Sequence, residues 1–163
     1  MNSIKYYIDI NLNDTPPRKK GKNASKTNYE IREQKAIDQA DPIKHPNLFT
    51  IDEIISLVNH FLDTHGIKQD NKLLDKSDFI WLKFTEDKYL GVVASGYDFN
   101  FSDKFISGCL ITKVEKKWDT TSLAVFPLSH MPRPYKIKDI EKAIGNYLIE
   151  NKVPIIDFYS HIY

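Results

Sequence analysis

The sequence predicts an α+β fold, a single domain over residues 1–163 in which two amphipathic helices pack on a mostly antiparallel sheet of five or six strands. Short apolar runs rich in β-branched residues, separated by turn residues, predict the strands. Apolar residues at helical spacing predict helices over 51–65 and 137–151. The length of 163 residues suits one core, and the aromatic content of 12% supplies large side chains for it.

At the N-terminus, apolar and polar side chains alternate over residues 4–12, which predicts a half-exposed strand. Residues 14–28 form a basic arm with no large apolar side chain, so we expect it to be mobile unless a partner holds it. Its cations are Arg18, Lys19, Lys20, Lys22 and Lys26. Thr27 opens a capping-box pattern, which predicts a short polar helix over 30–40.

The two predicted helices differ in their end signals. Helix 51–65 begins after a capping box formed by Thr50 and Glu53, and Gly66 supplies the left-handed residue expected after its end. Helix 137–151 begins after two prolines and is closed by Pro154. Both helices carry an apolar stripe, so both are expected to pack on one face of the sheet.

The remaining strands follow from apolar runs. Residues 79–84 and 89–95 predict an antiparallel pair joined by a turn, and residues 153–163 predict a short terminal strand. Residues 105–129 predict a hairpin with a charged tip at 115–119, and its second strand lies near the middle of the sheet because it is apolar on both faces. Pro127 marks the expected end of its pairing.

Composition bounds the possible partners and the location. The 23 lysines and arginines nearly balance the 22 aspartates and glutamates, so any electrostatic preference must be local. The single cysteine, Cys109, lies in a predicted strand and excludes an intrachain disulfide. No window approaches the length of apolar sequence that a membrane span needs, and we expect a cytoplasmic protein that does not bind membranes. The Lys-, Asn-, Ile- and Asp-rich composition suggests a bacterial or phage source.

One motif suggests metal chemistry. Glu115 and Lys117, with Asp98 or Asp103 upstream, have the residue types that hold a divalent ion and stabilise charge around an activated water. This pattern and the order of helices and strands resemble metal-dependent nucleases of the restriction-enzyme type, which would imply Mg²⁺ as cofactor. The simpler interpretation is a solvated, charged hairpin tip, and we favour it because Glu and Lys are ordinary turn residues. An extra predicted strand also departs from the nuclease order.

Other catalytic or metal sites have less support. Asp157, Ser160 and His161 have the residue types of a nucleophilic triad, but no strained nucleophile turn or oxyanion hole is evident around them. The five histidines show no metal-ligand spacing, and with one cysteine a structural zinc site is not expected. We therefore assign no resident metal or cofactor and commit to no catalytic residue.

The sequence favours a non-enzymatic binding module of the inhibitor, immunity or regulatory type. Aromatic and cationic side chains dominate interface energetics, and this chain has them in the basic arm and at its C-terminus. We expect a protein partner, contacted through the arm and through Phe158, Tyr159, His161 and Tyr163. The arm also has the charge to neutralise phosphates, so nucleic acid is a second possible partner. The metal-dependent nuclease is the alternative function.

Overall fold

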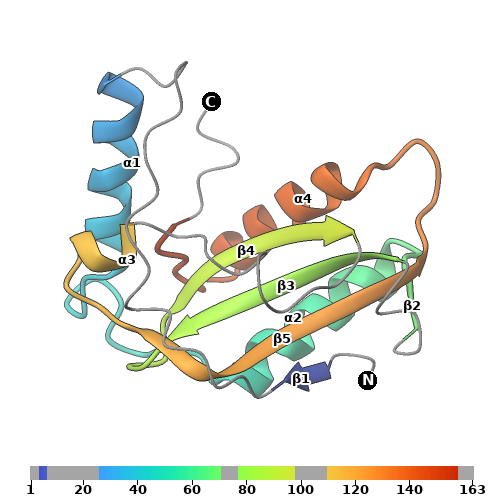
Figure 1. The fold of residues 1–163 in the computed structure, drawn as a ribbon, viewed down its shortest axis with the longest axis horizontal. Helices are drawn as coiled ribbons and strands as arrows, with labels where there is room; N and C mark the ends of the chain where they lie inside the picture. Colours follow the sequence, from blue (N-terminus) through green and yellow to red (C-terminus); the bar gives the residue numbers. More distant parts are fainter. Residues whose placement is uncertain (1–3, 7–25, 71–76, 98–109, 158–163) are drawn as a thin grey trace.

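The computed structural model describes residues 4–6, 26–70, 77–97 and 110–157, and it confirms the predicted α+β class. The sheet follows the order β1-β5-β3-β4, with β2 paired to the far end of β5, and all of these pairings are antiparallel (Figure 1). The strands are β1 (Ile4–Tyr6), β2 (Lys68–Gln69), β3 (Asp78–Thr85), β4 (Leu90–Tyr97) and β5 (Trp118–His130). The helices are α1 (Lys26–Gln39), α2 (Ile51–Thr64), α3 (Leu110–Lys113) and α4 (Ile137–Glu150).

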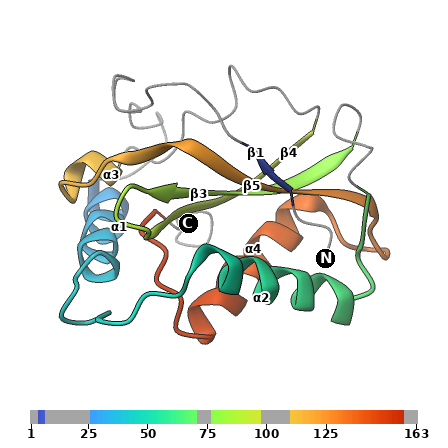
Figure 2. The same cartoon turned by 90° about the horizontal axis from the view of Figure 1, so that it is seen from below.

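Helices α2 and α4 cover one face of the sheet, as predicted (Figure 2). The predicted capping box opens α2: Glu53 N donates to Thr50 Oγ1 at 3.1 Å, and Thr50 N donates to Glu53 Oε1 at 3.2 Å. Gly66 has the expected positive φ of 68° after the helix. The apolar stripes of both helices pack on alternate residues of β3, so that Ile80, Leu82 and Phe84 are buried beneath them.

The opposite parity of β3 faces a second core. This second core consists of the buried side chains Ala36, Phe79, Trp81, Tyr89, Val92, Leu110, Ile111, Trp118, Leu123, Val125 and Ile156. Helices α1 and α3 lie together at one end of the sheet and contribute to it (Figure 1). Residues 79–85 of β3 are therefore buried on both faces.

The predicted hairpin at 105–129 is wrong in the described part of its first strand, whereas its second strand is confirmed as part of β5 inside the sheet. Residues 110–113 form helix α3 instead of a strand, because the consecutive residues Leu110 and Ile111 are both fully buried and a strand would turn one of them to the opposite face. Strand β5 begins at Trp118, and it pairs with β3 instead of with the first half of the predicted hairpin. Pairing also continues past Pro127, since β2 pairs with Leu128 and His130.

The ends of the chain were predicted in part. Strand β1 covers residues 4–6 of the predicted strand, and the rest of that strand lies outside the described residues. The basic arm lies outside them as far as residue 25, and its last three residues belong to α1. The predicted third helix exists, but it starts at Lys26, so Thr27 lies within it. Near the C-terminus, Ile155 forms a parallel bridge to Leu90, and residues beyond 157 lie outside the described part.

The described helices include none that is long and apolar enough to cross a bilayer.

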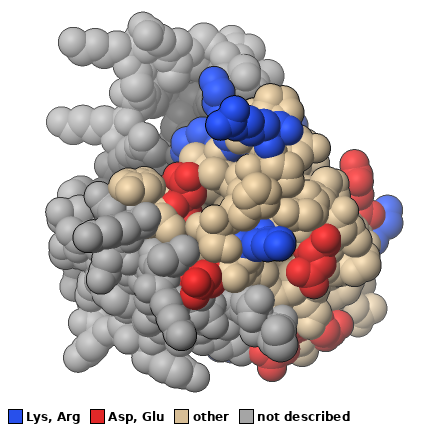
Figure 3. Space-filling view, turned by 90° about the vertical axis from the view of Figure 1, so that its right-hand side faces the viewer, with Lys and Arg blue, Asp and Glu red and all other residues tan. Residues whose placement is uncertain are grey.

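Figure 3 looks onto the end of the sheet where β2 and the connection from β5 to α4 lie. Many of the lysine and arginine side chains visible there gather toward the upper edge, while acidic side chains are scattered below them. Charge is thus distributed unevenly on a chain that is nearly neutral as a whole.

Candidate functional site

The motif Glu115 to Lys117 follows α3 in a turn at the surface. Glu115 adopts a left-handed conformation with φ 58°, and both Glu115 and Lys117 are exposed. Asp98 and Asp103 lie outside the described residues, so their approach to Glu115 stays a prediction. Within the described ranges, no group of three His, Cys, Asp or Glu side chains is placed to hold a metal ion.

The middle residue of this motif, Lys116, turns inward and has a structural role. Its ammonium pairs with Asp87 in the β3–β4 turn and lies 3.9 Å from the centre of the Tyr89 ring. Thr85 Oγ1 donates to the same carboxylate at 2.5 Å. Burial raises the pKa of Asp87, but the hydrogen bonds from Lys116 and Thr85 outweigh it and hold that pKa below its usual value. Lys116 therefore fastens the turn after α3 to the turn between β3 and β4.

The predicted partner-binding residues fall almost wholly outside the described part of the chain. This holds for Arg18, Lys19, Lys20, Lys22, Phe158, Tyr159, His161 and Tyr163, and for Ser160 of the triad considered above. Lys26 is the first residue of α1. Asp157 is described and is buried at the end of the chain segment that runs beside β4. The role of the arm and of the aromatic C-terminus stays a prediction.

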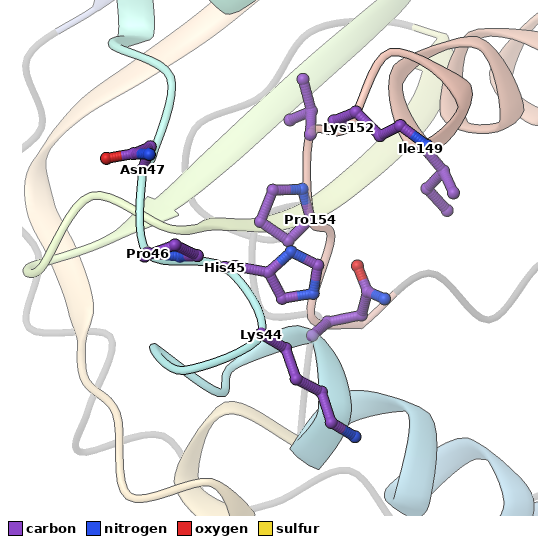
Figure 4. A pocket seen from close by; sticks show the side chains of 9 residues that line it. Lys44, His45, Pro46, Asn47, Ile149, Lys152 and Pro154 are labelled. Carbon is purple, nitrogen blue, oxygen red and sulfur yellow. The ribbon is translucent and has the colours of Figure 1, made fainter.

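A surface pocket of about 270 Å³ lies where three chain segments meet: the end of α1, the connection from α1 to α2, and the end of α4 (Figure 4). Two lysines and a histidine line it, and none of its described lining residues is acidic. The lining residues are Gln39, Lys44, His45, Pro46, Asn47, Ile149, Lys152, Val153 and Pro154. We call these residues, together with Ile43, the junction surface.

Local hydrogen bonds fix the connection that carries Ile43. Ile43 N donates to Asp41 Oδ1 at 2.8 Å, and His45 N donates to Asp41 O at 3.0 Å, so this carboxylate and carbonyl hold a tight turn after α1. Lys44 turns back to Asp38 on α1 with 2.8 Å between Nζ and Oδ1, while the His45 ring points toward Pro154 (Figure 4). The turn leaves Ile43 with 87% of its surface exposed.

The other side of the junction surface is set by the end of α4. Lys152 adopts a left-handed conformation with φ 68°, and Lys152 N donates to Ile149 O at 3.0 Å. This closure leaves Ile149 with 38% of its surface exposed at the pocket. Ile155 N donates to Gln39 Oε1 at 3.2 Å, which ties the segment after α4 to the end of α1. The junction surface is therefore a preformed concavity flanked by exposed isoleucines.

A second feature is a buried lysine on the opposite side of the sheet from α2 and α4. Lys83 shares its parity with Phe79 and Trp81 on β3, and it has no solvent-exposed surface. Its ammonium lies 4.3 Å from the centre of the Trp118 ring and 5.5 Å from that of Trp81. Burial lowers the pKa of Lys83 from 10.5 to about 7, although the nearby negative charge of Asp157 raises it.

Close packing holds the indole of Trp118 in this position. A methyl group in place of the Gly91 hydrogen would lie 2.2 Å from Cζ3 of Trp118, so the ring packs directly on the β4 backbone. Asp157 N donates to Gly91 O at 2.8 Å, which brings the buried carboxylate to the same end of β4. Strongly shifted pKa values occur both at functional sites and in structural charge networks. Because Lys83 is sealed from solvent, we treat it as a feature of the core and not as a surface for a partner.

Neither the junction surface nor Lys83 was predicted from the sequence. Lys83 had a readable signal, since a lysine on the parity of Phe79 and Trp81, in a strand that is apolar on both faces, must be buried. The junction surface had none, because the end of α1, residues 43–47 and residues 149–154 come together only through tertiary packing.

Comparisons of the chain with protein-family models, with curated proteins and with solved structures find no match.

Proposed function

We propose that this protein is a non-enzymatic binding module of the inhibitor, immunity or regulatory type, and that it contacts a protein partner through the junction surface. The observation that carries the proposal is the 87% exposed Ile43 beside a concave pocket. Burying an isoleucine side chain in an interface contributes about 2 kcal/mol to the free energy of binding. Ile43 does not gain this stabilisation in the free protein, because its side chain lies in solvent. An apolar projection next to a pocket is typical of the central part of protein interfaces.

The cationic residues favour a complementary partner. His45 and Lys152 line the pocket together with Lys44, and among the described lining residues none carries a carboxylate side chain. Lys44 is already paired with Asp38, so the ammonium of Lys152 and the ring nitrogens of His45 are left to meet the polar rim of a partner. Ile43 and Ile149 would supply the apolar contact. This division into an apolar centre and a polar rim supports a protein partner over a small metabolite.

The exposed positions of Glu115 and Lys117 give no specific support to the metal-dependent nuclease. That alternative requires the carboxylate of Asp98 or Asp103 to approach Glu115, and Mg²⁺ would be its cofactor. We therefore keep the binding module as the single proposal.

Site-specific photo-crosslinking in the source cells tests the proposal. A photoreactive amino acid replaces Ile43 in one variant and Tyr97, which is 54% exposed at the end of β4, in a matched control. We expect a defined cross-linked protein from position 43 and none from position 97. We further expect Ile43→Asp to weaken the purified complex by at least about tenfold, because a buried carboxylate would lose its hydration.

Two results would contradict the proposal. One is the same set of adducts from both positions, which would show non-specific contact. The other is an Ile43→Asp variant that binds the purified partner as tightly as the wild type while an Asp substitution at Tyr97 weakens it. Thermal unfolding of both variants controls for folding, since both side chains are exposed and neither belongs to a core.

A further inference from the structure

The end of the molecule formed by β2 and the connection from β5 to α4 carries a second continuous surface. Lys68 on β2 pairs directly with His130 at the end of β5. A methyl group on Gly66 would lie 3.7 Å from Pro132 Cγ, which places the turn after α2 against the β5–α4 connection. His65 and Tyr135 line one groove. We call the exposed residues His65, Lys68, His130, Arg133, Tyr135 and Lys136 the cationic end.

The cations of this surface are available to a ligand. Lys68, Arg133 and Lys136 form no ion pair with any side chain in the described part of the chain, and all three are exposed. The neighbouring acid, Asp139, accepts a hydrogen bond from Lys136 N at 3.1 Å and so caps α4. Figure 3 faces this end of the molecule and shows lysine and arginine side chains gathered toward its upper edge, with acidic side chains scattered below them. The cationic end thus has a local positive charge that the net charge of the chain conceals.

Aromatic rings accompany these charges. A groove of about 140 Å³ runs between the end of α2 and the start of α4, lined by Phe61, His65, Ile67, Tyr135, Asp139, Ile140 and Ala143. The His65 ring stacks on Phe61, with 4.0 Å between ring centres and an angle of 24° between the planes. Tyr135 is 46% exposed at the mouth of the groove. One side of the cationic end therefore presents ring faces beside an apolar concavity.

We infer that the cationic end binds single-stranded nucleic acid, with Lys68, Arg133 and Lys136 on the phosphates and Tyr135 as a stacking surface for a base. Cations on two chain segments, β2 and the β5–α4 connection, match a ligand whose charges repeat along a backbone. An aromatic ring beside them contributes to binding unpaired bases of any sequence. An acidic polypeptide would use the same charges, but only unpaired bases would stack face to face on the ring of Tyr135.

Fluorescence anisotropy with a labelled oligothymidylate of about 20 nucleotides and the full chain tests this inference. We expect binding that weakens with salt, in proportion to the number of phosphates neutralised. The double variant R133E/K136E should weaken it at least about tenfold at low salt and reduce the slope of log affinity against log salt by about 1.4. Tyr135→Ala should weaken binding by about fivefold or more and leave the salt slope unchanged. The matched control K35E/K113E makes the same charge change on exposed residues of α1 and α3, at the opposite end of the sheet, and should leave binding unchanged.

Three outcomes would overturn the inference. The first is no binding by the wild type at low salt. The second is equal weakening by R133E/K136E and by K35E/K113E, which would indicate only a general charge effect or binding by the basic arm. The third is a Tyr135→Ala variant that binds as tightly as the wild type while polyglutamate competes as well as oligothymidylate, which would indicate an acidic polypeptide ligand. Circular dichroism of each variant verifies that it is folded.

Discussion

Replacing Lys83 by methionine should remove a large part of the pH dependence of stability. The ammonium loses its hydration in the second core, and burial lowers its pKa from 10.5 to about 7. At about 1.4 kcal/mol for each pH unit, holding this lysine charged in the folded state costs about 5 kcal/mol. The ammonium lies 4.3 Å from the centre of the Trp118 ring, and this cation–π contact stabilises the charged form by about 2 kcal/mol at most. The cost of desolvation is larger, so the pKa of Lys83 is lowered.

The sign of the effect follows from proton binding. Between about pH 7 and pH 10.5 the unfolded chain holds the Lys83 proton and the folded chain does not, so the free energy of unfolding rises with pH in this window. Below it both states are protonated, and the full cost of the buried charge is present. The free energy of unfolding of Lys83→Met minus that of the wild type should therefore fall by about 3 kcal/mol from about pH 6.5 to about pH 9.5.

Urea unfolding followed by tryptophan fluorescence at several pH values measures this difference. Lys142→Met is the matched control, because Lys142 is exposed on α4 and the substitution removes the same charge without changing the core. A difference between Lys83→Met and the wild type that stays constant across this pH range, as expected for Lys142→Met, would refute a neutral Lys83 in the folded protein.

Three further predictions concern stability. Asp157→Asn removes a charge that raises the pKa of Lys83, so the rise of stability with pH should begin at lower pH, as measured by the same titration. Gly91→Ala should reduce the free energy of unfolding by about 2 kcal/mol or more, because the new methyl group would overlap Trp118; an unchanged urea midpoint would contradict the close packing. Thr50→Ala should reduce the free energy of unfolding by about 1 kcal/mol, because α2 loses its cap. Thr50→Ser should leave the free energy of unfolding close to that of the wild type, because serine keeps the capping hydroxyl.

The elements with complete local signals were predicted from the sequence. Helix α2 has its cap, its apolar stripe and its terminal glycine within one stretch, and the structure ends it one residue before the predicted His65. Strands β3 and β4 were predicted because each is an apolar run and the turn between them is short. Local signals suffice where the partners of an element are close in sequence.

The elements that depend on distant contacts were missed or misassigned. The β-branched residues near Ile111 favour a strand locally, but burial against α1 and Trp118 makes them helical. The position of β5 beside β3 instead of β4 is a choice between two edges that no local pattern encodes. The junction surface likewise joins the α1–α2 connection to the end of α4, which lies about a hundred residues later in the chain, so no local pattern indicates it.

Strand β5 sets the distance between the two proposed binding surfaces. Its 13 residues span about 40 Å in extended form, from Trp118 beside α3 to His130 at the cationic end. The junction surface lies toward the α1 end of the sheet, so a ligand on one surface would not collide with a ligand on the other (Figure 1). Binding free energies at such separated sites are expected to add, and one molecule would then be able to tether a protein to a nucleic acid strand.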